Sequence, residues 1–97
     1  MTTPAQEAQQ RQHAEARLAA LAANLNVRGV LTRIDADNLA ILNDGGQQAD
    51  TIFCRPWPLD RDAWWFFDCA GEPLAEAGDI VGAAVAILGN LQSGTHG

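Results

Sequence analysis

The 97-residue chain has the length of one small domain, and 47% of its residues are apolar. Its net charge is −6 and its six basic residues are all arginines, which argues against nucleic acid or an anionic membrane as a partner because phosphate binding needs clustered positive charge. No apolar run approaches the roughly 20 residues that span a membrane, and the first 12 residues are polar. We therefore expect a cytoplasmic protein.

The chain opens with the pattern of a helix. Thr3 and Pro4 fit a helix N-terminus, because threonine can cap and proline suits the first helical position. Apolar residues recur at helical spacing from Ala14 to Leu25, so we expect the ordered core to begin near residue 14. Asn24 and Asn26 are the residues at which we expect this helix to end.

Short β-type segments follow, separated by turn-forming residues. Strands are predicted over 27–34, 39–42, 51–55 and 63–69, with a short edge strand over 72–76. Asp44, Gly45 and Gly46 predict a hairpin, because such residues tolerate the positive φ of tight turns. Pro56 and Pro58 end the third strand, since proline cannot donate to a ladder.

A second helix closes the chain. Asp79 is placed to cap it, and an apolar stripe runs from Ile80 to Leu91. Residues 92–97 are expected to form a disordered tail, which leaves an ordered core of about 14–91. The sequence therefore predicts one α+β domain over 1–97, an antiparallel four- to five-stranded β-meander flanked by an N-terminal and a C-terminal helix.

The run from Trp64 to Phe67 holds four consecutive aromatic residues around which the domain should assemble. Counting by twos assigns side chains to two sheet faces, starting from the polar residues Arg33, Asn43, Thr51, Arg55 and Asp68. One face receives Leu31, Arg33, Leu39, Ile41, Phe53, Arg55, Trp64 and Phe66. The other receives Val30, Ile34, Ala40, Leu42, Ile52, Cys54, Trp65, Phe67 and Cys69. Both faces are then apolar, whereas a sheet with one solvated face should alternate.

Two arrangements can hide two apolar faces. Each helix can cover one face, or both helices can share a face and leave the other as an apolar patch. A second copy of the chain, another protein or a flat ligand would cover that patch. The predicted binding residues are Leu31, Arg33, Ile41, Phe53, Arg55, Trp57, Trp64 and Phe66.

Two features of this surface have alternative interpretations. Arg33 and Arg55 can clamp a carboxylate, or they can form surface pairs with aspartates at positions 35, 60 or 62. Trp57, between two prolines, can anchor a partner or form a lid over one end of the core.

No catalytic, metal or cofactor residue is predicted. We interpret Cys54 and Cys69 as two buried small hydrophobic residues. The predicted strand register does not place them opposite each other, which argues against a disulfide. Asp60, Asp62 and Asp68 read as solvated turn carboxylates. A Ser-His-Asp set, a phosphate-binding glycine loop and a zinc-ligand spacing are all missing from the sequence.

Three short motifs carry a resemblance to known proteins: Cys54-Arg55-Pro56, Trp64-Trp65-Phe66 and Gly71-Glu72-Pro73-Leu74. With the two helices, this pattern over about 18–91 resembles a group of small actinobacterial proteins of uncharacterised function. The order helix, meander, helix is also similar to the architecture of type III secretion chaperone-like proteins. Neither resemblance implies an activity or a site residue, because fold does not fix function.

The leading hypothesis is a non-enzymatic interaction or chaperone-like accessory protein that uses an apolar sheet face, either as a homodimer or on another protein. The alternative is a small-molecule-binding module with an aromatic pocket around Trp57, Trp64 and Phe66. An enzyme is the third and least favoured hypothesis.

Overall fold

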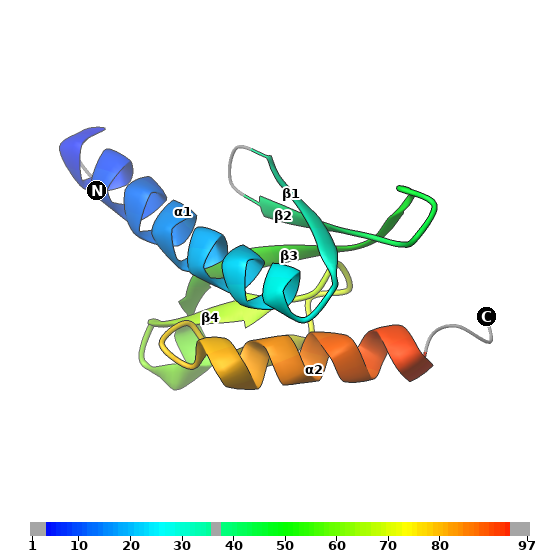
Figure 1. The fold of residues 1–97 in the computed structure, drawn as a ribbon. Coiled ribbons are helices and arrows are strands. Elements are labelled where there is room, and N and C mark those ends of the chain that lie inside the picture. Colours follow the sequence, from blue (N-terminus) through cyan, green and yellow to red (C-terminus); the bar gives the residue numbers. More distant parts are fainter. Residues whose placement is uncertain (1–3, 36–37, 94–97) are drawn as a thin grey trace.

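The fold is an antiparallel β-meander between two helices (Figure 1). The computed structural model describes residues 4–35 and 38–93. Its elements are α1 (Pro4–Val27), β1 (Leu31–Asp35), β2 (Asn38–Leu42), β3 (Gln48–Trp57), the short 3₁₀ helix η1 (Pro58–Asp60), β4 (Ala63–Phe67), β5 (Pro73–Glu76) and α2 (Ile80–Ser93). The strands form one sheet in the order β1-β2-β3-β4-β5, which confirms the predicted α+β class. The predicted cap, Thr3, lies outside the described residues.

The C-terminus of α1 is set by Gly29 and not by the predicted asparagines. The Val30 N–H donates to the Leu25 carbonyl at 2.9 Å and the Gly29 N–H donates to the Asn26 carbonyl at 3.0 Å. Gly29 has a φ of 86°, so these bonds form the Schellman motif that closes many helices. Val27, expected to open the first strand, is instead the last residue of α1 and is fully exposed at 89%.

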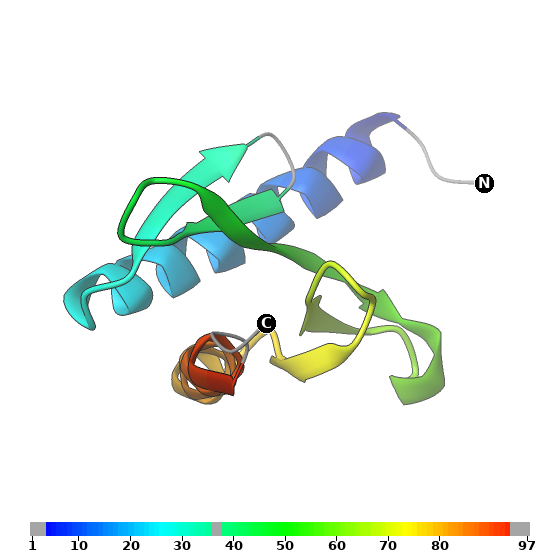
Figure 2. The ribbon, with the colours of Figure 1, turned by 90° about the vertical axis from the view of Figure 1, so that its right-hand side faces the viewer.

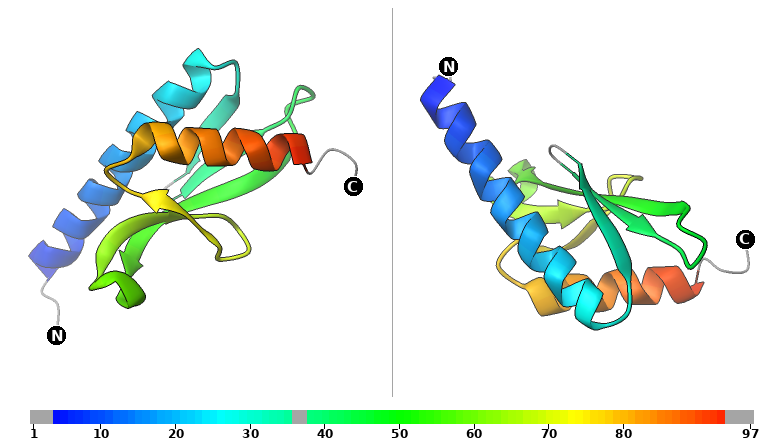
Figure 3. Two further views of the ribbon diagram at one scale, coloured as in Figure 1. Left: turned by 90° about the horizontal axis from the view of Figure 1, so that it is seen from below. Right: turned by 45° about the horizontal axis from the view of Figure 1, so that its top comes forward.

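Both helices pack on the same face of the sheet (Figure 3). One buried core joins Leu18 and Leu21 of α1, Ile87 of α2, Ile52 of β3 and Phe66 of β4. We call the helix-packed side of the sheet the inner face and the opposite side the outer face. The sheet is visibly twisted between its β1 and β5 edges (Figure 2), and its outer face carries neither described helix.

The face predictions for β2 and β4 are wrong by one residue. Leu39 pairs with Ile52, and Cys54 pairs with Phe66, so all four lie on the inner face. Ile41 belongs with them and is completely buried. Trp64, two residues before Phe66, lies on the same side and packs against the core.

The error arises because two of the polar residues used to label the faces lie in turns. Asn43 Oδ1 accepts hydrogen bonds from the N–H groups of Gly45 (3.0 Å) and Gln47 (2.9 Å) and so holds the β2–β3 hairpin. Asp68 Oδ1 accepts from the Glu72 N–H at 2.9 Å in the β4–β5 turn. A side chain that caps a turn does not report which face of the preceding strand is solvated.

The last helix begins as predicted and ends later. Asp79 caps α2, because its Oδ1 accepts the Gly82 N–H at 3.0 Å. The helix continues to Ser93, so the expected tail at 92–97 starts too early, and residues 94–97 lie outside the described residues. Neither described helix combines the length and hydropathy that crossing a bilayer requires.

Candidate functional site

Four aromatic side chains gather on the outer face across β3 and β4. Phe53 pairs with Phe67, and Arg55 pairs with Trp65, so these residues point to one side of the sheet together with Trp57 at the end of β3. All four aromatic residues are half-buried. Since neither α1 nor α2 lies above them, they gain their partial burial from one another, from η1 and from the neighbouring loops.

Trp57 packs over this cluster. Its ring meets Trp65 edge-to-face with centroids 4.8 Å apart, and it meets Phe67 in the same way at 5.9 Å. The Trp65 Nε1–H donates to Asp60 Oδ2 at 2.7 Å, and Asp60 belongs to η1, which directly follows Trp57. Trp57 therefore covers part of the outer aromatic cluster and not the helix-packed core.

The two candidate arginines have different surroundings. Arg33 forms the predicted surface pair with Asp35, at 3.3 Å between Nη2 and Oδ2. Arg55 pairs with neither Asp60 nor Asp62; its guanidinium carbon lies 4.3 Å from the centre of the Phe53 ring. An exposed guanidinium resting on an aromatic ring keeps its donors free for a carboxylate.

A groove of about 510 Å³ lies on the outer face beside the aromatic cluster. We call it the outer groove; its lining includes Phe53, Arg55, Trp57, Phe67, Asp68 and Cys69. Three of the eight predicted binding residues meet there: Phe53, Arg55 and Trp57. The groove therefore combines flat aromatic surface with one basic side chain, Arg55, and one acidic side chain, Asp68.

The two cysteines lie on different sides of the sheet, and both are free. Cys54 is 4% exposed on the inner face, where burial raises the pKa of its thiol to about 11 against a smaller opposing effect of Arg17. Cys69 is exposed, which contradicts its predicted burial, and its hydrogen bond to the Asp50 carboxylate, followed by the charge of that carboxylate, raises its pKa. Neither environment favours the thiolate that nucleophilic chemistry needs.

Within residues 4–35 and 38–93, no three His, Cys, Asp or Glu side chains are placed to hold a metal ion. No protein-family model, curated protein or solved structure matches this chain. The choice among candidate sites therefore depends on local geometry alone.

The predicted binding residues divide between the two faces. On the outer face lie Leu31, Arg33, Phe53, Arg55 and Trp57, whereas on the inner face lie Ile41, Trp64 and Phe66. The predicted aromatic pocket of Trp57, Trp64 and Phe66 does not form, because Trp57 is separated from the other two by the sheet. In place of Trp64, the outer cluster contains Trp65 and Phe67.

Trp64 has its own neighbours at the edge of the inner face. Its ring lies edge-on to His13 of α1, with centroids 4.8 Å apart. A hollow of about 280 Å³ adjoins both rings and is otherwise lined by glutamines of α1. This hollow is smaller than the outer groove, and its lining includes no aspartate, glutamate, lysine or arginine.

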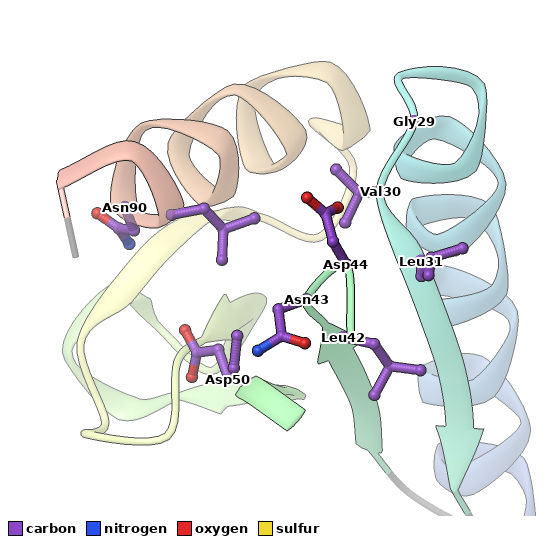
Figure 4. Close-up of a pocket in the computed structure, with 10 residues that line it drawn as sticks. Gly29, Val30, Leu31, Leu42, Asn43, Asp44, Asp50 and Asn90 are labelled. Atoms are coloured by element: carbon purple, nitrogen blue, oxygen red, sulfur yellow. The ribbon is translucent and has the colours of Figure 1, made fainter. Parts of the chain in front are cut away.

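A second large cavity, which we call the end cavity, lies between the start of β1, the β2–β3 hairpin and the end of α2 (Figure 4). Its volume is also about 510 Å³, and the polar ends of Asn43, Asp44, Asp50 and Asn90 gather around its open space. Two of these groups already serve the fold. Asn43 holds the hairpin, and Asp50 Oδ1 accepts the N–H groups of Thr51 and Cys69. The outer groove, with its aromatic rings and free guanidinium, is the stronger candidate.

Proposed function

We propose that this protein is a non-enzymatic interaction protein that binds another polypeptide chain through the outer face of its sheet. The observation that carries the proposal is the aromatic cluster of Trp57, Trp65, Phe53 and Phe67, with Arg55 beside it and neither α1 nor α2 above it. Tryptophan, phenylalanine and arginine are enriched at protein interfaces, and tryptophan and arginine dominate the hot spots within them. A chaperone-like accessory role is the form of this function in which the bound chain is a different protein.

The exposed thiol of Cys69 gives a direct test, because it lines the outer groove while Cys54 is buried. A maleimide photo-crosslinker attached to Cys69 would sit at the groove. The matched control moves the thiol to the exposed position 23 of α1, as Ala23→Cys in a Cys69→Ser background. Both labelled proteins are irradiated in cells or in concentrated extract.

We expect crosslinks to protein from Cys69 and few from position 23. The mass of the product distinguishes a second copy of the chain from a different protein. Trp57→Ala should reduce the yield from Cys69, because it removes the residue that spans the aromatic cluster. Equal yields from both attachment positions would contradict the proposal.

A small-molecule-binding function is the second candidate, and the volume of the outer groove favours it. About 510 Å³ lies within the ~300–1,000 Å³ typical of ligand pockets, and the free guanidinium of Arg55 suits a flat carboxylate. Tryptophan emission reports on binding from both sides of the sheet. A ligand in the groove should still change the emission of Trp64→Phe but should have much less effect on Trp57→Phe; the opposite pattern would exclude the groove as the binding site.

A further inference from the structure

One row of paired residues crosses the outer face perpendicular to the strands. Arg55 of β3 pairs with Trp65 of β4, which pairs in turn with Glu76 of β5. Neighbouring strands lie about 4.8 Å apart, so Arg55 and Glu76 stand on either side of Trp65 at nearly equal distances. The row therefore consists of a positive charge, an aromatic ring and a negative charge, in that order.

The two charges of this row have no ionic partner in the described part of the chain. Arg55 and Glu76 are both exposed, and the ion pair that forms among the described residues joins Arg33 to Asp35. Arg55 rests on the Phe53 ring. Both charged groups are thus available to a partner that approaches the outer face.

This order of charges is complementary to itself. A two-fold axis that runs parallel to β4 above Trp65 turns a second copy face-down onto the first and exchanges the two sides of the row. Arg55 of each copy then stands opposite Glu76 of the other, and the two Trp65 side chains face each other. Isologous dimers have this property, in which residue i meets j and j meets i.

We propose that the partner of the outer face is a second copy of this chain, bound sheet to sheet about this two-fold axis. The inference rests on the proposed function and names its partner. Aligned sheets pack about 10 Å apart, a spacing that the aromatic side chains of both copies can fill. Two reciprocal Arg55–Glu76 pairs fix the register at the centre of the interface.

Charge reversal at the two ends of the row tests this geometry. In Arg55→Glu homodimers, two glutamates meet at each end, and in Glu76→Arg homodimers, two arginines meet. We expect each variant to dimerise at least tenfold more weakly than the wild type in sedimentation velocity across a concentration series. An equimolar mixture of the two variants restores both opposite-charge contacts, so it should recover the wild-type dimer as a heterodimer.

Arg11→Glu is the matched control. It changes the net charge by the same amount as Arg55→Glu, and it lies at an exposed position of α1, away from the outer face. Its dimer affinity should remain within about twofold of the wild type. Far-UV circular dichroism of every variant separates lost association from lost folding.

The possible outcomes separate this inference from the proposed function. A wild-type protein that is monomeric at millimolar concentration overturns the second copy as partner, while crosslinks from Cys69 to a different protein would leave the proposed function standing. A wild-type dimer whose mixture of charge variants shows no recovery overturns the two-fold pairing. Recovery in the mixture, with Arg11→Glu unaffected, is the result we expect.

Discussion

Two neighbouring residues of β4 show how differently the two faces of this sheet are used. Phe66 is completely buried beneath the helices, where it belongs to the core with Leu18 and Ile87. Phe67 points to the outer face, is half-buried, and touches Trp57 edge-on. The same residue type thus supports folding at one position and is available for association at the next.

The comparison teaches that helix coverage, and not hydrophobicity, separates the two roles in this domain. The inner face is covered by the apolar stripes of α1 and α2. The outer face has more aromatic rings, but among the described residues it is covered by its own side chains and by η1 and not by α1 or α2. A change on the inner face should therefore affect stability, and a change on the outer face should affect association.

The largest expected effect contrasts Phe66→Ala with Phe67→Ala. Removing a fully buried phenylalanine leaves a cavity and should lower the free energy of unfolding by about 3–5 kcal/mol. Phe67→Ala removes a half-exposed ring and its contact with Trp57, which should cost about 1 kcal/mol. Urea denaturation followed by circular dichroism measures both values.

Phe66→Leu is the control for the loss of volume, and it should retain most of the stability that Phe66→Ala loses. Equal losses for Phe66→Ala and Phe67→Ala would contradict the contrast between the faces. That result would mean that the outer cluster contributes to folding as much as the core does.

The order and types of the elements could be predicted from the sequence because they depend on local signals. The Asp44-Gly45-Gly46 turn, Pro58 directly after β3 and the Asp79 cap all lie where the sequence places them. Pro56, expected to end the third strand, instead lies inside β3 and pairs with Trp64. Strand ends were less accurate: β3 begins at Gln48 and not at position 51. Gly29 was available as the signal for the end of α1, since glycine tolerates the positive φ that the Schellman motif needs.

The faces of β2 and β4 could not be predicted. Alternation assigns side chains to the correct face only if at least one residue of the strand is known to point to solvent. Asn43 and Asp68 were poor labels, since their side chains hold turns beyond the strand ends. Irregular register after Ile41 and after Phe66 adds to the difficulty. Strand β3 was phased correctly because Arg55 lies inside the paired region.

The correct face assignment of β3 and the wrong one of β4 determine how much of the site could be predicted. Phe53, Arg55 and Trp57 all belong to β3, and they form the predicted part of the outer groove. Trp65 and Phe67 were assigned to the wrong face together with the rest of β4. Their position follows from cross-strand pairing, which a single sequence does not reveal.

The next prediction uses the buried thiol of the inner face. The pKa of Cys54 is about 11 in the folded protein, against about 9 for an unperturbed thiol. Folding therefore favours the neutral thiol, and its stabilising contribution is complete below pH 9 and is lost as the pH rises toward 11. The chain has no lysine and no tyrosine, so the cysteines are the side chains expected to titrate in this window.

Urea midpoints measured at pH 8, 9, 10 and 11 test this expectation. The stability of the wild type should fall over this range, and Cys54→Ala should show a much shallower fall. Cys69→Ala, on the exposed side, should retain most of the wild-type slope. If the fall in stability with pH persists in Cys54→Ala but disappears in Cys69→Ala, the thiol responsible is Cys69 and not Cys54.

A smaller effect is expected from the hydrogen bond that anchors the outer cluster. Asp60→Asn replaces a charged acceptor of the Trp65 indole N–H by a neutral one, which should cost about 1 kcal/mol. Asp62→Asn is the matched control, because its backbone has a φ of 59°, which asparagine also tolerates. Its stability should stay within about 0.5 kcal/mol of the wild type. Equal losses in both variants would indicate a general charge effect and not the indole bond.

The smallest effect concerns α2, one of the two helices that cover the inner face. A Cβ at Gly82 would lie 2.1 Å from Asp79 Oδ2, so alanine there displaces the carboxylate that caps the helix. The gain in helix propensity, about 1 kcal/mol, and the loss of the cap, also about 1 kcal/mol, should nearly cancel in Gly82→Ala. Once Asp79→Ala has removed the cap, the same Gly82→Ala change should stabilise the protein by up to about 1 kcal/mol.

Gly89→Ala, later in the same helix, is the control for this cycle because a Cβ there meets no atom within 4 Å. It should stabilise the protein equally with and without Asp79, since the two positions share no contact. Additive effects of Gly82→Ala and Asp79→Ala would contradict the clash. Non-additive effects at Gly82 together with additive effects at Gly89 would show that the first turn of α2 is held by its cap. The stability of α2 on the inner face would then depend on the Asp79 carboxylate as well as on the core beneath the helix.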